Sequence, residues 1–456
     1  MRKHRWRPLG SSLLALAGAV GGLAVATPCA QASGFSVARF SGEHGHPTTD
    51  NPTALYFNPA ALRGKRAELL VDGLVAYRSA SYTRTRQPTD APDVAGAEGA
   101  NVGRATLDNF LFNPSLWLAL PLSERWLLAA GVFTPFGGPV SWDTRAELAR
   151  SPHPGIVDGV TRFHSMEALF TTSYASLGAS FAATPRLRFG LALNTMYTRI
   201  DDVRAWSGGS NGVVGEGRSL LEVDGVDFGF AAGAFYEAEA VRIGASYQSR
   251  PNVSGGSRLH GKLSNNIGGP SSADVELHQD LPDIVRLGLA YRARRNVELR
   301  LFGAWERWSA FERQCVTQAG EECELNGDGS QPNGAHVLQN VPRDFHDAFD
   351  VRGGVSVWPW PALEVFSGIG VMSQAVPERT LETSLPDFVG VTFALGAKYR
   401  VSEAFSVAGS LSHLVSPARN AESTLQDGEL PSQLPSASGH YTQDIGFLDL
   451  NLAVRF

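Results

Sequence analysis

Hydrophobic and polar residues alternate with a period of two along most of the chain, and the C-terminal stretch GFLDLNLAVRF shows this most clearly. The residues of one parity are Leu448, Leu450, Leu452, Val454 and Phe456, and those between them are Asp449, Asn451, Ala453 and Arg455. The same alternation recurs in LRFGLALNTMYTRIDDVR (187–204) and DIVRLGLAYRA (283–293). Successive side chains of a β-strand point to opposite faces, so the pattern predicts strands with one apolar and one polar face.

We expect fourteen such strands. They lie near residues 66–86, 107–121, 125–137, 163–183, 186–204, 221–236, 240–260, 273–293, 297–313, 346–358, 362–377, 385–401, 404–417 and 441–456. Short connections, such as 123–125 and 402–404, alternate with long polar ones, such as 138–162 and 314–345. Short turns at one end and long loops at the other are typical of outer-membrane β-barrels. A soluble β-sandwich also has alternating strands, but the alternating loop lengths favour the barrel.

The predicted fold is therefore all-β, a 14-stranded antiparallel transmembrane β-barrel (66–456) plugged by a small N-terminal hatch (33–65). A closed sheet pairs every backbone N–H and C=O within the protein, as hydrocarbon requires. Fourteen strands enclose a lumen too wide for the barrel's own side chains to fill. Residues 33–65 are rich in Gly, Pro and Asp and lack the alternation of a strand. We expect this compact segment to fill the lumen.

The first 32 residues predict a secretory signal peptide. A basic start, MRKHRWRPLG, precedes an apolar stretch from Leu9 to Ala26, and Ala30 and Ala32 form an A-x-A cleavage site. The alternatives are a retained anchoring helix, because about 18 apolar residues can just span a bilayer, and a lipoprotein attached through Cys29. Cleavage would remove four basic residues and no acid, leaving the chain more acidic than its formal net charge of −6.

Composition and charge narrow the function classes. Hydrophobic residues make up 43% of the chain and charged residues 18%, and the net negative charge gives no basic face for a nucleic acid. Two cysteines remain after cleavage, Cys315 and Cys323, and an even pair in an exported protein suggests a disulfide. Two free thiols in a loop are the alternative.

The positions of the histidines do not indicate a metal site or a catalytic site. His44 and His46 flank a glycine, but no set of carboxylates or cysteines completes a metal site. His164 lies beside Ser165, an arrangement that invites comparison with outer-membrane phospholipases. On a strand, these neighbours would point to opposite faces and could not share a site. We therefore expect no enzyme, no metal and no cofactor.

Several motifs resemble the long-chain fatty acid transporter family of outer membranes (FadL type, OmpP1/FadL/TodX). They are Gly34-Phe35, the hatch motif Asn58-Pro59-Ala60, LPDIVRLGLAYR (281–292), WERWSAFE (305–312), FHDAFDVRGGVSV (345–357) and VPERTLETSLPD (376–387). Each match is weak alone, but together they follow the family's order over nearly the whole mature chain. The resemblance implies a 14-stranded barrel that passively transports hydrophobic compounds. Long-chain fatty acids are the expected ligands, and monoaromatic hydrocarbons, carried by relatives, are the alternative.

A break in the barrel wall is expected in the third strand, WLLAAGVFTPFGGPVSW. Pro135 lacks the N–H of a ladder hydrogen bond, and Gly137 and Gly138 weaken the pairs that follow. The resemblance places the family's kinked strand here, with a lateral exit for the ligand beneath it. The alternative is that Pro135 merely ends the membrane-crossing part of the strand.

Ligand-binding residues follow partly from chemistry and partly from the resemblance. An arginine facing the lumen can bind a carboxylate with two parallel hydrogen bonds, and Arg204 has lumen parity. The family has a basic residue at the matching position; an ordinary ion pair with Asp201 or Asp202 is the alternative. A second family cation aligns with Val341 here, with Arg343 nearby, so this departure puts strict carboxylate selectivity in doubt. Phe35 is the expected lining residue.

Two other classes of function stay open, a general porin and a non-transporting surface or adhesion barrel. A porin would have no plug and would conduct ions openly. An adhesion barrel would need neither a kink at Pro135 nor an apolar path through the lumen. The expected partners are hydrophobic small molecules, outer-membrane lipid and the barrel-assembly machinery, which would recognise terminal Phe456. We expect a monomer in the outer membrane.

Overall fold

The computed structural model describes most of the chain. The described residues are 45–88, 90, 92–207, 215–253, 256–266, 269–326, 332, 334, 336–422 and 435–456. The predicted signal peptide (1–32), Gly34, Phe35 and His44 lie outside them.

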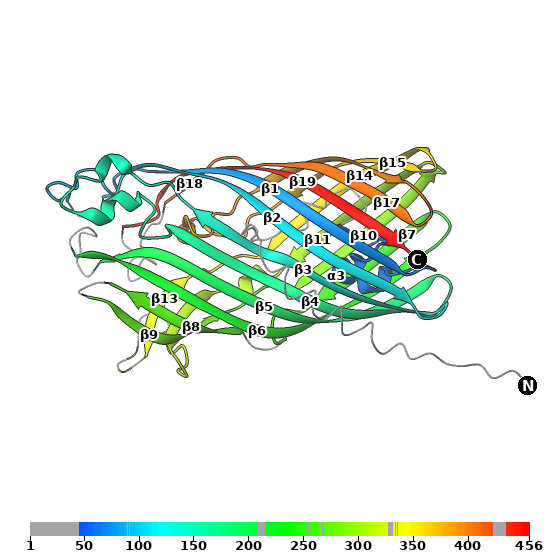
Figure 1. The fold of residues 1–456 in the computed structure, drawn as a ribbon, viewed down its shortest axis with the longest axis horizontal. Helices are drawn as coiled ribbons and strands as arrows, with labels where there is room; N and C mark the ends of the chain where they lie inside the picture. The colour runs from blue at the N-terminus through cyan, green and yellow to red at the C-terminus, as the bar shows by residue number, and fades with distance from the viewer. Residues whose placement is uncertain are drawn as a thin grey trace, which may run out of the picture.

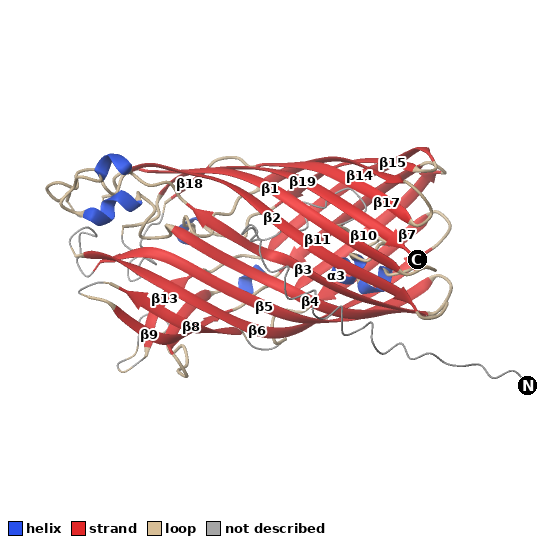
Figure 2. Ribbon diagram, in the orientation of Figure 1, coloured by secondary structure: helices blue, strands red, loops and turns tan. Residues whose placement is uncertain are grey.

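One closed antiparallel sheet dominates the fold (Figures 1 and 2). Its segments are β1 (Glu68–Arg84), β2 (Gly103–Pro121), β3 (Trp126–Ser141), β4 (Glu167–Ala182), β5 (Leu187–Ser207), β6 (Glu216–Glu237), β7 (Val241–Gln248), β8 (Ser257–Asn265), β9 (Ser271–Gln279), β10 (Ile284–Arg294), β11 (Val297–Glu306), β12 (Arg313–Gln318), β13 (Val337–Pro342), β14 (Ala348–Trp360), β15 (Leu363–Met372), β16 (Gly390–Arg400), β17 (Phe405–Val415), β18 (Arg419–Ala421) and β19 (Gly439–Arg455). The sheet closes because β1 pairs with both β2 and β19.

The helices in the described part of the chain are short. They are α3 (Ala54–Phe57) and the 3-10 turns η2 (Pro59–Ala61), η3 (Ala146–Leu148), η4 (Pro154–Asp158), η5 (Trp308–Ala310) and η6 (Glu378–Thr380). Among the described residues, no helix has both the length and the apolar character needed to cross a membrane.

The nineteen described segments make up fourteen strands, as the sequence predicts. Five segments continue a neighbour across a break: β7 runs on into β8, β9 into β10, β11 into β12, β13 into β14, and β17 into β18. For example, β6 pairs with both β7 and β8. Several strand boundaries differ from prediction by a few residues, and two of the differences change the picture. The strand expected at 346–358 gains β13 from the predicted loop, and the strand expected at 163–183 begins at Glu167, because residues 161–164 form a turn.

Four of these breaks lie side by side in the sheet. They fall between β7 and β8, between β9 and β10 (280–283), between β11 and β12 (307–312) and between β13 and β14 (343–347). Beyond this row of breaks, β8, β9, β12 and β13 pair with one another and form the outer end of the wall. The disulfide Cys315–Cys323 lies in this outer part, with a Cα–Cα distance of 6.2 Å.

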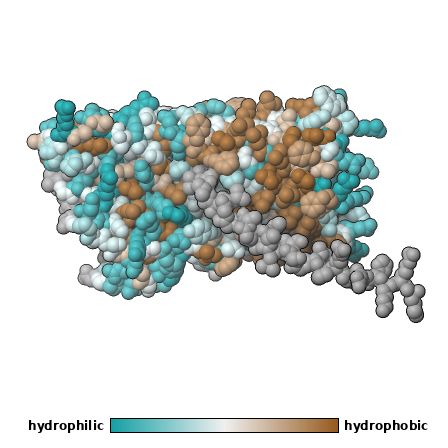
Figure 3. Space-filling model, in the orientation of Figure 1, coloured by the Kyte–Doolittle hydropathy of each residue, from teal (hydrophilic) through white to brown (hydrophobic). Residues whose placement is uncertain are grey.

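The two faces of the barrel follow the predicted alternation. Leu450 and Leu452 are 55% and 48% exposed, whereas the alternating residues Asp449 and Asn451 are 2% and 6% exposed. Apolar side chains gather on the outside of the half of the barrel nearer the C-terminus, and hydrophilic side chains dominate the end with the long loops (Figure 3). The outer face thus suits hydrocarbon, and the polar residues of the strands face inward.

Residues 45–62 pack against the inner side of the wall at β4 to β7 (Figure 1). The Asn58 side-chain amide donates to the carbonyls of Pro47 (3.0 Å) and Ala234 (3.1 Å), and its oxygen accepts from the Ala60 amide (3.1 Å). Ser246 Oγ donates to the Phe57 carbonyl at 2.6 Å. The predicted hatch motif therefore joins this segment to the barrel. Whether it blocks the lumen stays a prediction.

Strand glycines allow this close approach. A Cβ atom added to Gly190 would lie 2.2 Å from the Ala60 nitrogen, and one added to Gly233 would lie 2.0 Å from Asn58 Oδ1. Both distances are shorter than van der Waals contact, so the segment can lie here only against bare backbone.

We expect Gly233→Ala to displace the N-terminal segment, because the added methyl group overlaps Asn58 and overpacking costs about 1–3 kcal/mol. The measurement is ion conductance of the purified barrel in planar lipid bilayers, which should rise above that of the wild type. Gly446→Ala is the matched control, since nothing lies within 4 Å of its added Cβ. Equal conductance of all three proteins would argue against a plugging role.

Candidate functional site

An apolar cavity lies inside the barrel, between β3 and the row of breaks. Its empty volume is about 1070 Å³, the part open to solvent included. Apolar residues supply most of the lining, among them Phe136, Val140, Ile200, Leu281 and Trp308. Cavities of this kind, with a few polar groups in an apolar lining, are the usual sites for small hydrophobic ligands.

The strand breaks supply three of the aromatic residues of the lining, Trp308, Phe311 and Phe345. The turn η5, which interrupts the strand between β11 and β12, carries Trp308. Its ring lies 6.3 Å from that of Phe136 on β3 and 6.0 Å from that of Phe345, both measured between centroids. Residues that leave the ladder at a break can turn their side chains inward, which a regular strand would allow only at every second position.

On the opposite side, the cavity borders an irregularity in β3. Phe133 pairs with Tyr174 and Phe136 with Thr172, so β3 contains one more residue than β4 between these pairs. Pro135 lies within this bulge. Gly137 follows at φ 109°, and a Cβ there would lie 1.9 Å from the Phe170 carbonyl oxygen. Gly137 and Gly138 both line the cavity. The predicted kink residues thus lie at a real irregularity of the strand.

The ladder between β2 and β3 is incomplete beside this bulge. Within the described residues 103–141, the two strands pair only from Pro121↔Leu127 to Leu116↔Val132. Further out, side chains of β2 bridge the β2–β3 seam. Asn113 donates to the Thr134 carbonyl (2.9 Å) and Asn109 to the Pro139 carbonyl (3.1 Å). Side-chain amides therefore replace backbone hydrogen bonds along the seam.

The connection between β15 and β16, residues 373–389, folds inward over the cavity, and we call it the inner loop. Its Asp387 carboxylate accepts hydrogen bonds from the amides of Ala375 (2.5 Å) and Val376 (3.1 Å). Trp142, just after β3, donates its indole N–H to the Thr383 carbonyl at 3.1 Å. These bonds fix a loop that sequence analysis took partly for strand ends and partly for an exposed connection.

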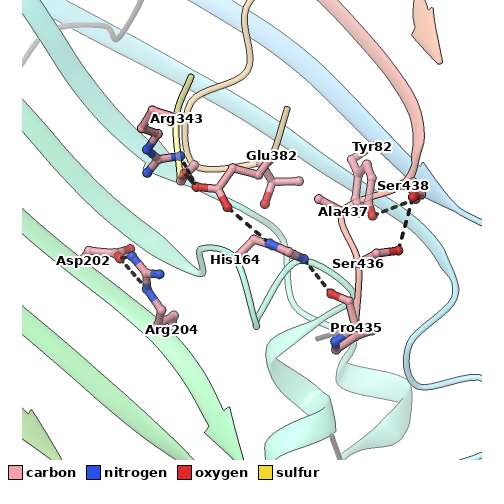
Figure 4. A network of polar contacts seen from close by, with 12 residues as sticks. Tyr82, His164, Asp202, Arg204, Arg343, Glu382, Pro435, Ser436, Ala437 and Ser438 are labelled. Atoms are coloured by element: carbon pink, nitrogen blue, oxygen red, sulfur yellow. Dashed lines mark hydrogen bonds and ion pairs between the residues drawn. The ribbon is translucent and has the colours of Figure 1, made fainter. Parts of the chain in front are cut away.

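Glu382 of the inner loop binds Arg343, which lines the cavity (Figure 4). Arg343 Nη1 donates to Glu382 Oε1 at 2.5 Å, while its Nε and Nη2 donate to Gln314 Oε1 at 3.0 and 2.5 Å. His164 Nδ1 lies 3.4 Å from Glu382 Oε2, and its Nε2 lies 2.9 Å from the Pro435 carbonyl oxygen. Burial alone would raise the pKa of Glu382, but the charge of Arg343 and the bond with His164 lower it well below the ordinary value.

Arg204 forms the second ion pair of the cavity. Its Nε donates to Asp202 Oδ2 at 2.6 Å, and its Nη2 contacts the same oxygen. Both residues are at least nine-tenths buried and line the cavity. Figure 4 shows this pair beside the Arg343–Glu382–His164 group. The ion pair with Asp202, which the sequence left open as an alternative for Arg204, is present in the structure.

Sequence reasoning named Arg204 and Arg343 as ligand-binding candidates but did not predict their surroundings. Arg204, Arg343 and Val341 all line one cavity. Asn58, Pro59 and Ala60 lie outside this cavity, against the wall formed by β4 to β7. Glu382 lies in the VPERTLETSLPD stretch, yet nothing in its local pattern shows that the loop turns inward.

One sequence argument about His164 and Ser165 was wrong in its premise. The two residues lie in the turn before β4, not on a strand. Strand alternation therefore does not separate their side chains. Their environments differ all the same, because His164 bonds to Glu382 and to the Pro435 carbonyl, whereas Ser165 Oγ is buried without a hydrogen-bond partner.

Known proteins resemble this chain along most of its length. The family described as "Outer membrane protein transport protein (OMPP1/FadL/TodX)" matches residues 15–442. Outer membrane protein P1 of Haemophilus influenzae is 20% identical over 447 residues, covering 89% of each chain.

Solved structures share the fold. A Pseudomonas aeruginosa FadL homologue superposes with a TM-score of 0.73 at 15% identity, covering 94% of this chain and 99% of that one. The Ralstonia pickettii toluene transporter TbuX gives 0.62 at 16% identity, covering 92% and 98%. The P. putida toluene transporter TodX gives 0.64 at 15% identity, again covering 92% and 98%.

The lowered pKa of Glu382 predicts how docking of the inner loop depends on pH. A carboxylate with a depressed folded-state pKa contributes its full stabilisation above the unfolded-state pKa and loses it as pH falls toward the folded-state pKa. Hydrogen-exchange protection of 373–389, corrected for intrinsic rates, should thus stay constant from pH 7 to pH 5 and fall only below the ordinary value of 4.5.

Glu382→Gln is the variant that tests this cause. It should lower protection at pH 7 at least about tenfold, because it removes one partner of a buried pair. The matched control is Glu378→Gln in the same loop, whose side chain is exposed. Protection of the wild type that was already lost between pH 7 and pH 5 would contradict the assignment.

Proposed function

This chain belongs to the OMPP1/FadL/TodX family of outer membrane transport proteins, and we propose that it carries hydrophobic compounds passively through the apolar cavity and releases them sideways at the β2–β3 seam. The family match makes it an outer membrane β-barrel that transports hydrophobic compounds. The observation that carries the lateral route is the contact between the cavity lining and the bulge of β3, where the backbone ladder to β2 is missing.

The polar lumen at the short-turn end of the barrel favours a sideways exit over an exit along the barrel axis. Below residues 45–62 lies a polar cavity at the short-turn end of the barrel, with about 2200 Å³ of empty volume. Charged side chains line it, and two of them, Arg242 and Arg300, form ion pairs with Glu298. An apolar molecule gains nothing by leaving an apolar cavity for a charged one, whereas the lipid beyond the seam preserves its solvation. In this proposal residues 33–65 act as the plug.

Two ligand classes fit the cavity to different degrees. Long-chain fatty acids, which the sequence favours, would use Arg204 and Arg343, and both arginines do line the cavity. Monoaromatic hydrocarbons are the second candidate. They need no cation, and both arginines already carry acidic partners from the same chain. Two structures of similar fold are toluene transporters by name.

Deleting Pro135 tests the lateral route. The deletion removes the extra residue of β3 and the position without an N–H, so β3 can pair regularly. We expect uptake of labelled oleate and toluene, measured in a Gram-negative host lacking its own fatty-acid transporter, to fall at least about tenfold relative to the wild type, since closing the seam leaves no unpaired wall to pass.

The matched control is Pro359→Val, an exposed proline of β14, a strand that pairs with β11 and β15 and borders neither β2 nor β3. All proteins must be present in the outer membrane in equal amounts. If the deletion variant takes up both probes as fast as the wild type does, the exit is not at this seam.

A further inference from the structure

Both arginines of the apolar cavity are already occupied by carboxylates of the chain itself. Asp202 takes two nitrogens of Arg204, Nε and Nη2. Glu382 takes Nη1 of Arg343, and Gln314 takes the remaining two nitrogens of that guanidinium group. A ligand carboxylate binds arginine best through two parallel N–H donors. In this cavity those donors point at protein acceptors.

Burial makes this arrangement costly to undo. Arg343 and Glu382 are each 2% exposed, and Arg204 and Asp202 are 8% and 5% exposed. An anionic ligand that took either guanidinium would leave Glu382 or Asp202 charged, buried and without its cation, in addition to losing its own hydration. An uncharged molecule of the same length avoids both costs and loses none of the apolar contact.

The acids also come from parts of the chain that are held in place. Asp202 belongs to β5, which is paired along both sides. Glu382 belongs to the inner loop, and further bonds from Ser384 and His164 hold its carboxylate toward Arg343. The Glu382 carboxylate cannot swing away without breaking its bonds with Ser384 and His164, and the backbone of Asp202 is fixed by the strand pairing of β5.

We infer that Asp202 and Glu382 are selectivity determinants, which make the apolar cavity accept uncharged hydrophobic molecules and reject carboxylates. The inference rests on the proposed transport function and names the ligand chemistry at that same site. Each acid acts as an internal substitute for the ligand carboxylate. Removing its charge should free an arginine and open the cavity to fatty-acid anions.

The test compares two probes that differ only in charge, 9,10-dibromostearate and the corresponding dibromo alcohol. Bromine quenches a tryptophan that it contacts, and Trp308 lines the cavity. Binding to the full-length protein in lipid nanodiscs is measured at pH 9, where the free acid is ionised, and the signal of a Trp308→Phe variant is subtracted. We expect the wild type to bind the alcohol at least about tenfold more tightly than the acid.

Two variants carry the prediction, Glu382→Gln and Asp202→Asn, and each must migrate as a folded barrel in unheated gels. Either one should strengthen binding of the acid relative to that of the alcohol at least about tenfold. The exposed neighbour Glu378→Gln should behave like the wild type. If one variant fails to insert, the other still decides the question.

The outcomes separate the two proposals. A wild type that binds the acid as tightly as the alcohol, or variants that leave the ratio unchanged, would overturn the role of the two acids while leaving transport intact. A wild type that binds neither probe would overturn the proposed cavity function and this inference together.

Discussion

Backbone pairing is the constraint on which the rest of this structure depends. A chain in hydrocarbon cannot leave N–H and C=O groups without partners, so the sheet must close, and β1 meets both β2 and β19. Each departure from the ladder then needs its own compensation. At the β2–β3 seam, Asn109 and Asn113 supply it with side-chain amides. A hydrogen bond made by a side chain can open without unpairing a strand, which explains why a passage can exist there.

Charged side chains inside the barrel need partners for the same reason as the backbone groups do. The lumen holds many buried acids and arginines, and in the apolar cavity they occur as neighbouring pairs from β5, from the strand breaks and from the inner loop. Such pairs add little stability compared with an apolar core, but losing one partner is costly. These ion pairs therefore limit which ligands can enter the cavity. Its lining is apolar, and its polar groups already have hydrogen-bond partners within the protein.

The fold could be predicted from the sequence because each strand shows its two-residue alternation within its own residues. Alternation marks each strand, turn length marks each end, and the bulge at Pro135 was visible from a proline that has no ladder hydrogen bond to donate. Glu382 was beyond its reach, because a loop that folds inward does so through distant partners such as Trp142 and Arg343. β13 was missed for a similar reason, since only its pairing with β12 distinguishes this short segment from a loop.

The row of breaks across four adjacent strands divides this part of the wall into an outer and a lower ladder of strands. The outer ladder consists of β8, β9, β12 and β13, and it has its own pairings and its own disulfide. The lower ladder of β7, β10, β11 and β14 keeps its register without it. Insertions and substitutions above the breaks therefore do not have to preserve alignment below them. The outer part of this wall can thus tolerate changes of loop length and of surface chemistry that the membrane-inserted ladder cannot.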